Sequence, residues 1–193
     1  MSTLNKPYID KNELFIRKKC ADYMIKLFSS FKILTDDAIK LICMVLGEKT
    51  DDLVHEIICF LTEEDKNKFE DDIEEYQRDT DEYAQSIGRM ISSCNRNTRS
   101  KIGTIILISL RETSLSLKYR GLCDLEKRLQ HMRQAFGLND LETEFVLFFF
   151  ICKICDPCLA FFIGTLDVEQ VKGRKYLEKI LGMKVGGGKM QDL

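Results

Sequence analysis

Tryptophan is absent from the 193 residues, and proline and histidine each occur only twice. Because proline interrupts helices and glycine weakens them, two prolines and eleven glycines leave room for long helices along most of the chain. His55 lies beside an apolar stripe and His131 on a solvated flank, and neither belongs to a Ser–His–Asp or Cys–His set. We therefore expect a non-catalytic protein that needs no cofactor.

The chain also lacks a large net charge of either sign. The chain has 29 basic and 31 acidic residues, a net charge of −2, so no general attraction to nucleic acid or to a membrane surface is expected. Residues 1–11 contain no apolar segment of the kind that directs secretion. We expect a cytoplasmic protein in which the eight cysteines remain thiols.

Apolar residues recur at intervals of three and four along nearly the whole chain, which is typical of amphipathic helices. Polar caps precede these segments at Asp10, Thr35 and Asn139, and Gly47 and Gly137 end two of them. The pattern predicts an all-α fold, a multi-helix orthogonal bundle of about eight to ten helices.

The boundaries of the domain and of its helices follow from the same signals. Residues 1–182 are predicted to form the bundle, and residues 183–193 a flexible tail or the beginning of a following winged-helix element. The polar segment Asn95–Thr98 is predicted to be a loop. Ile102–Leu110 is rich in β-branched residues, but it lacks strict alternation and has no partner strand, so we predict a buried helix.

The longest apolar run is Val146–Leu166, interrupted by Lys153, Asp156 and Pro157. Its length approaches the ~20 residues that span a bilayer. Since proline ends one helix and aspartate can cap the next, we predict a buried helical hairpin instead. Its first arm, residues 140–155, is apolar nearly all round and is expected in the middle of the bundle. A membrane span and peripheral membrane contact are the alternatives.

Residues 63–82 form an acidic segment with eleven acidic and three basic residues, a net charge of −8. It is either a solvated helix with a thin apolar stripe or an acidic docking surface for a basic partner. The candidate contact residues are Glu70, Asp71, Asp72, Glu74 and Glu75. Because the whole chain carries −2, the remainder carries +6, and the molecule is electrically polarised.

Residues 172–189 form a basic segment in which six basic residues oppose Glu178, a net charge of +5. The pattern fits an amphipathic helix whose basic face is solvated or contacts a protein partner. The candidate residues are Lys172, Arg174, Lys175 and Lys179. A glycine turn follows, so the helix could also open a helix-turn-helix, and nucleic-acid binding is a less favoured alternative.

Cys152, Cys155 and Cys158 have the spacing C-x2-C-x2-C, which suits an iron–sulfur cluster when the local chain is an irregular loop. Here the first two fall on an apolar helix, no fourth ligand follows in the sequence, and a structural zinc ion needs four ligands. We expect these residues to be core thiols. A metal site and a redox switch are the alternatives.

The segment Phe136–Glu142, followed by Phe145–Phe148, resembles the "FGLS-x-x-E…(I/V)LL" segment in the N-terminal regions of bacterial AAA-family ATPases. Those proteins continue with an Asp-Pro pair, matched here by Asp156-Pro157, and with an amphipathic helix, matched by Tyr176–Gly182. The resemblance covers Leu122–Leu181, about a third of the chain. It implies a helical region that precedes a helix-turn-helix and the ATPase module.

The chain departs from that family because it lacks the ATPase module. Gly186–Lys189 is not a phosphate-binding loop, since Met183 and Met190 stand where the Walker pattern needs glycine and serine or threonine. No Walker B motif, sensor or arginine finger is present. We therefore expect the N-terminal, substrate- or partner-recruiting domain of an AAA-type ATPase, which binds protein. A helix-turn-helix nucleic-acid-binding regulator and a thiol or metal sensor are the alternatives, and the oligomeric state stays open.

Overall fold

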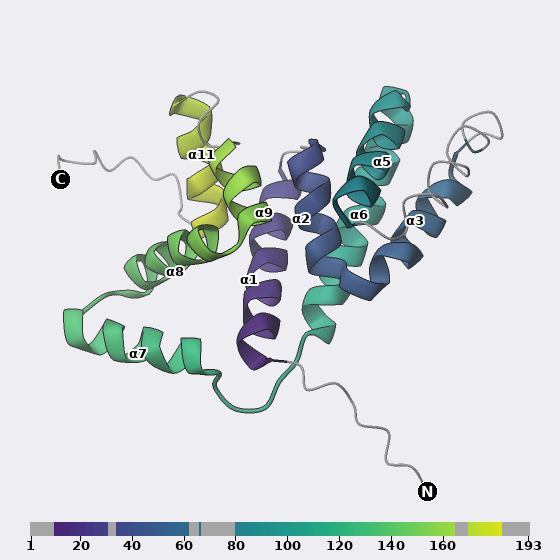
Figure 1. The fold of residues 1–193 in the computed structure, drawn as a ribbon. Coiled ribbons are helices and arrows are strands. Elements are labelled where there is room, and N and C mark those ends of the chain that lie inside the picture. Colours follow the sequence, from purple (N-terminus) through teal and green to yellow (C-terminus); the bar gives the residue numbers. More distant parts are fainter. Residues whose placement is uncertain (1–9, 31–33, 62–65, 67–79, 165–169, 183–193) are drawn as a thin grey trace, which may run out of the picture.

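The computed structural model describes residues 10–30, 34–61, 66, 80–164 and 170–182. Over these ranges the chain is all-α and contains no strand, so the predicted fold class is confirmed. The elements (Figure 1) are α1 (Lys11–Phe28), α2 (Asp36–Leu46), the 3-10 turn η1 (Gly47–Lys49), α3 (Thr50–Cys59), α5 (Thr80–Ser93), α6 (Arg96–Ser116), α7 (Asp124–Phe136), α8 (Asp140–Ile154), α9 (Asp156–Cys158), the π-helical turn η2 (Leu159–Ile163) and α11 (Gln170–Leu181).

Helix α1 lies at the centre of the bundle and packs against α2, α6 and α11 (Figure 1). Helix α2 in turn packs against α5, and α3 packs against α6. One continuous core joins these helices, and Tyr23, Met24 and Leu27 of α1 are fully buried in it. Lys19 Nζ donates to both carboxylate oxygens of Glu144, at 3.0 and 2.9 Å, and this ion pair joins α1 to α8.

Three predicted helix starts are confirmed by their caps. The Asp10 carboxylate and the Thr35 hydroxyl each accept a hydrogen bond from a backbone N–H in the first turn of the helix that follows. Asn139 and Glu142 form the predicted capping box, in which each side chain accepts from the backbone N–H of the other residue. These bonds satisfy amide groups that the first turn of a helix leaves without partners.

The loop predicted at Asn95–Thr98 is wrong, because helix α6 begins at Arg96. The Asn95 side chain accepts hydrogen bonds from the backbone N–H groups of Asn97 and Thr98, so the polar residues that indicated a loop form a helix cap. The helix predicted over Ile102–Leu110 is confirmed and lies within α6, with its core-facing isoleucines buried.

The expectation that residues 140–155 lie in the middle of the bundle is wrong. One side of α8 is buried through Leu147, Phe148, Ile151 and Cys152. The side chains around the rest of the helix are exposed, by 43% at Phe145, 36% at Val146, 38% at Phe149, 42% at Phe150 and 50% at Ile154. Helix α8 lies at the edge of the bundle beside α7 (Figure 1). A sequence that is apolar on every side does not show how many of its sides the fold covers.

The chain turns sharply after α8, as the Asp156-Pro157 pair predicts, but it forms a corner instead of a hairpin. The segments Asp140–Ile154 and Asp156–Ile163 meet at a bend of 113°. The N-cap residue of α9 is Cys155, not the predicted Asp156. The Cys155 side chain makes no capping hydrogen bond to the first turn of α9. In the described part of the chain no single helix is long and apolar enough to cross a membrane, and only this bent pair reaches the required length and composition together.

Candidate functional site

The structure does not describe most of the charged side chains that are predicted to contact a partner. The acidic candidates Glu70, Asp71, Asp72, Glu74 and Glu75 lie outside the described residues, as does the segment 183–193. On α11, Lys175 and Lys179 are exposed, whereas the side chains of Lys172 and Arg174 are not described. The acidic docking surface and the nucleic-acid-binding helix therefore stay predictions that rest on composition.

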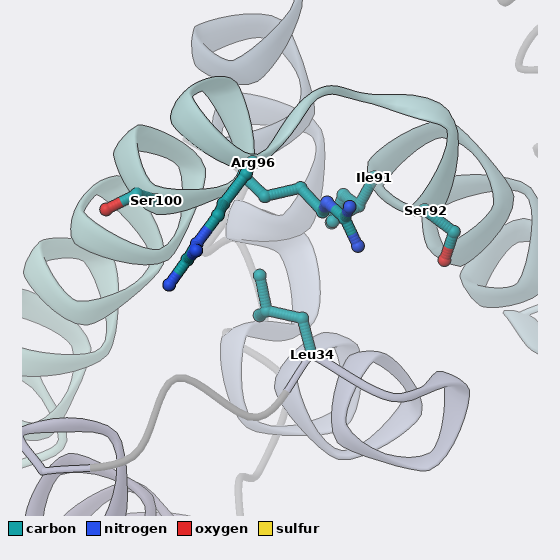
Figure 2. Close-up of a pocket in the computed structure, with 6 residues that line it drawn as sticks. Leu34, Ile91, Ser92, Arg96 and Ser100 are labelled. Atoms are coloured by element: carbon teal, nitrogen blue, oxygen red, sulfur yellow. The ribbon is translucent and has the colours of Figure 1, made fainter.

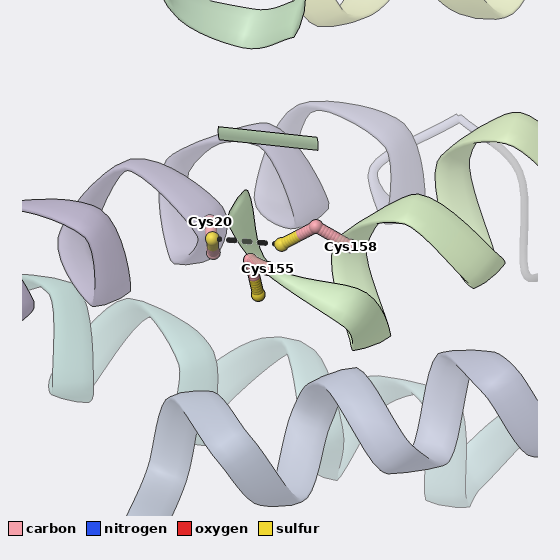
Figure 3. Close-up of side chains that lie close together, drawn as sticks. All are labelled: Cys20, Cys155 and Cys158. Atoms are coloured by element: carbon pink, nitrogen blue, oxygen red, sulfur yellow. Dashed lines mark hydrogen bonds between the residues drawn. The ribbon is translucent and has the colours of Figure 1, made fainter. Parts of the chain in front are cut away.

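The cysteine site is a different set of three from the one that the sequence spacing suggests. The Sγ atoms of Cys20, Cys155 and Cys158 all lie within 4.8 Å of one another. Cys20 Sγ on α1 and Cys158 Sγ on α9 point toward each other and are 3.1 Å apart (Figure 3). Cys152 is buried on α8 but is not a member of this group. The corner after α8 separates Cys155 and Cys158 from the helical face of Cys152 and brings them to α1.

The three thiols differ in exposure and in acidity. Cys20 and Cys158 are fully buried, whereas Cys155 is half-buried. Hydrogen bonds from the Cys158 and Cys20 thiols stabilise a Cys155 thiolate and lower the pKa of Cys155. The same bonds, together with burial, hold the pKa of Cys158 well above its ordinary value. Cys155 is thus both the member of the cluster nearest to solvent and the one whose thiolate the other two thiols stabilise.

A second sulfur donor lies beside this cluster. Met44 Sδ on α2 is 3.3 Å from Cys155 Sγ. The thioether carries no proton and accepts the S–H of a neutral Cys155. Four sulfur atoms from α1, α2 and the corner after α8 thus meet in one part of the core.

An open cavity of about 590 Å³ lies where Leu34, the end of α5 and the beginning of α6 meet (Figure 2). Arg96 and Arg99, both exposed, give it a positive charge. Among the described residues that line it there is no carboxylate, imidazole or thiol. The described lining therefore offers no general base that could activate the hydroxyl of Ser92 or Ser100.

Helices α7 and α8 leave a large apolar area open to solvent. Helix α7 contains no buried residue, although its apolar residues recur at helical spacing as predicted. Phe136 at its end is 75% exposed, and Leu122 before it is 43% exposed. Among the described residues, exposed large apolar side chains thus concentrate on α7 and α8, and such concentrations mark interaction sites on soluble proteins.

A groove runs between the two helices within this area. It has a volume of about 180 Å³, and we call it the α7–α8 groove. Its lining residues are Leu125, Arg128, Leu129, Met132, Val146, Leu147 and Phe150. All but one of these side chains are apolar, so the groove suits apolar side chains of a ligand, and none of its described lining residues is a general acid, a general base or a nucleophile.

No family model, curated protein or solved structure matches this chain. The function is therefore inferred from the groove and from the cysteine cluster themselves.

The sequence contained a signal for the exposed apolar side of α8 but none for the cysteine cluster. Phe148, Phe149 and Phe150 are consecutive, and three successive residues of a helix span most of its circumference. A neighbour that covers one side must leave at least one of them exposed, which is the arrangement found. Cys20, in contrast, is separated from Cys158 by 138 positions, and no spacing rule connects residues at that distance.

Proposed function

We propose that this chain is a non-catalytic protein-binding module whose α7–α8 groove holds an amphipathic helix of a partner protein. The observation that carries the proposal is the open apolar lining of the groove, where Val146 and Phe150 are 36% and 42% exposed. Helix-in-groove recognition uses a pair of helices of this kind as the receptor.

A specific complex needs several apolar anchors that bind together. Full burial of one large apolar side chain contributes about 1.5–3 kcal/mol. Loss of translational and rotational freedom on association costs about 4–15 kcal/mol, so several anchors must act together. An amphipathic helix offers anchors at i, i+3, i+4 and i+7, and the groove lining spans two turns of α7 from Leu125 to Met132. Met132 has a flexible side chain that adapts to anchors of different shape.

The charge of the groove specifies the partner further. Arg128 is exposed and is the charged residue that lines the groove in the described part of α7 and α8. Its guanidinium group is suited to paired hydrogen bonds with a carboxylate. The partner helix is therefore expected to carry an apolar stripe with an aspartate or glutamate beside it.

The groove lies in the part of the chain that resembles the N-terminal regions of AAA-family ATPases. Residues 122–181 contain both α7 and α8. We extend the proposal accordingly: the module recruits a substrate or a regulatory partner to an ATPase of this type. The resemblance supports this extension, and the groove supports protein binding without it.

A selection from a library of helical peptides tests the proposal. The full chain is the bait, and the Phe150→Glu variant is used to remove peptides that bind elsewhere. Enriched peptides are expected to be amphipathic and acidic, and fluorescence anisotropy is expected to show at least tenfold weaker binding to Phe150→Glu. Arg128→Glu is expected to weaken the same peptides because it replaces attraction with repulsion.

The matched control is Phe60→Glu, since Phe60 is 52% exposed at the end of α3, outside the groove. Its peptide affinity is expected to equal that of the unmodified chain. A selection that enriches no peptide dependent on Phe150 contradicts the proposal. A dimer in light scattering that Phe150→Glu dissociates assigns the groove to a second copy instead. Vesicle binding that the same substitution abolishes assigns it to a membrane surface.

A further inference from the structure

The positions of the three clustered sulfur atoms come close to the geometry of a bound metal ion. A metal–thiolate bond of about 2.3 Å places the sulfur atoms of a tetrahedral site about 3.8 Å apart. In the protein, Cys20 Sγ and Cys158 Sγ are 3.1 Å apart, and the two pairs that include Cys155 also fall within 4.8 Å. Each pair therefore differs from the ideal separation by about 1 Å or less, a change that rotation of cysteine side chains supplies.

We propose that Cys20, Cys155 and Cys158 form a binding site for a thiophilic d10 cation, either Cu(I) or Zn(II) with water as its fourth ligand. The donor set selects these ions, because thiolate ligands favour soft cations over Mg2+ and Ca2+, which prefer oxygen. Within the described residues the group contains sulfur ligands and no carboxylate or imidazole. The site is distinct from the α7–α8 groove and does not depend on its function.

Met44 extends the donor set. Its Sδ atom lies 3.3 Å from Cys155 Sγ. Thioether sulfur is a ligand for Cu(I), whereas the zinc ligands of proteins are thiolate, imidazole and carboxylate. The effect of Met44 therefore distinguishes the two ions. Met44 is expected to contribute to Cu(I) binding and to have little effect on Zn(II) binding.

Binding exchanges protons for metal. Each S–H bond that breaks yields one metal–sulfur bond and one proton released to solvent, so the site releases one proton for each cysteine that is still protonated before binding. Cys155 is half-buried and gives an ion access from solvent, whereas Cys20 and Cys158 hold it in the core. The affinity is therefore expected to increase with pH.

The site also joins two parts of the fold. Cys20 belongs to α1, and Cys155 and Cys158 stand on either side of the Asp156-Pro157 corner. A bound ion would hold this corner against α1 and stabilise the folded state according to its affinity.

An anaerobic titration of the reduced full chain tests the proposal. Cu(I) is added in the presence of bathocuproine disulfonate and Zn(II) in the presence of a chromophoric chelator, and a pH indicator records proton release. One ion per chain is expected, and Cys20→Ser, Cys155→Ser and Cys158→Ser are each expected to weaken binding at least 100-fold. Met44→Leu is expected to weaken Cu(I) binding alone.

The matched controls are Cys152→Ser, which alters a buried thiol of the same sequence run, and Cys59→Ser, which alters an exposed one. Both are expected to bind metal as the unmodified chain does. Because Cys155 is half-buried, Cys155→Ser is expected to fold even if the two core variants do not, and circular dichroism verifies this. X-ray absorption of the complex is expected to show sulfur neighbours at about 2.3 Å.

Three results would overturn the proposal. The first is that neither ion binds in competition with its chelator. The second is that binding persists in Cys155→Ser or is lost in the Cys152→Ser control. The third is that the thiols bind no metal and are converted by oxidised glutathione to a disulfide, which identifies the cluster as a redox pair.

Discussion

The ring of Tyr23 on α1 meets the ring of Phe148 on α8 edge to face, with ring centroids 5.3 Å apart. Both side chains are fully buried, and Phe162 contacts both, with centroids 6.3 Å from Tyr23 and 5.2 Å from Phe148. Aromatic pairs in this geometry contribute about 0.5–1.5 kcal/mol beyond the burial of their area. This group of three rings holds α8 to α1, while the opposite side of α8 faces solvent.

Phe148→Ala is therefore expected to lower the free energy of unfolding by about 3–5 kcal/mol, because it removes a fully buried ring and leaves a cavity. Phe149→Ala is the matched control, since the neighbouring ring is 38% exposed. It is expected to cost less than about 1 kcal/mol. Urea denaturation measures both. Equal losses would show that α8 is buried on all sides, contrary to the structure.

Thr113→Val is expected to raise the free energy of unfolding by about 1 kcal/mol. Thr113 on α6 is 2% exposed, and its hydroxyl has no hydrogen-bond partner among the described residues. A buried hydroxyl without a partner costs about 1–3 kcal/mol, and valine keeps the branched shape without that cost. Thermal denaturation measures the change. A lower melting temperature for the variant would show that the hydroxyl is bonded in solution.

Gly47→Ala is expected to destabilise the protein by about 2–3 kcal/mol. Gly47 ends α2 at φ +57°, and a side chain in that conformation is strained by about 1–3 kcal/mol. An added Cβ would also lie 2.7 Å from Nη2 of Arg17, which donates a hydrogen bond to the Val45 carbonyl. Gly164→Ala is the control, because Gly164 is helical and, among the described residues outside its own helical turn, no atom lies within 4 Å of its added Cβ. It is expected to be neutral or stabilising by about 0.5–1 kcal/mol, and a loss equal to that of Gly47→Ala would contradict the explanation.

The stability of the fold is expected to fall as the pH rises above 9. Burial raises the pKa of Cys152 from 9.0 to about 12, so the folded state retains a proton that the unfolded state loses between those values. The stabilisation is complete below pH 9 and is lost as the pH approaches 12, by up to about 1.4 kcal/mol per pH unit. Urea denaturation between pH 7.5 and 10.5 is expected to show a smaller decrease for Cys152→Ala than for the exposed control Cys59→Ala. An identical decrease in both variants would exclude Cys152 as a source of the effect.

The helices and their ends could be predicted from the sequence because the interactions that define them are local. Asn139 caps a helix through a bond to a residue three positions away, and both members of that capping box are visible in the sequence. Asn95 shows the limit of this reasoning, since a polar cluster fits both a loop and a cap. Whether Asn95 begins a loop or caps a helix depends on the isoleucines that follow it, because their burial holds α6 in the core.

The candidate sites could not be predicted because they depend on contacts between distant segments. The sequence spacing grouped Cys152 with Cys155 and Cys158. In the structure the chain bends at Asp156-Pro157, and Cys155 and Cys158 lie beside Cys20 of α1 instead of Cys152. In the same way, the apolar residues of α8 indicate burial, but the number of helices around α8 decides how many sides are covered. Both features are properties of the packing and not of any local pattern.

The most direct test of the proposed function is methyl NMR of the full chain during titration with a selected amphipathic, acidic helix. Chemical shift changes are expected at Leu125, Leu129, Met132 and Val146, which line the α7–α8 groove, and not at Leu27 or Ile42 of the core. Changes that cluster on α3 or α5 at saturation, with the groove methyl groups unaffected, would contradict the proposal that this groove binds protein.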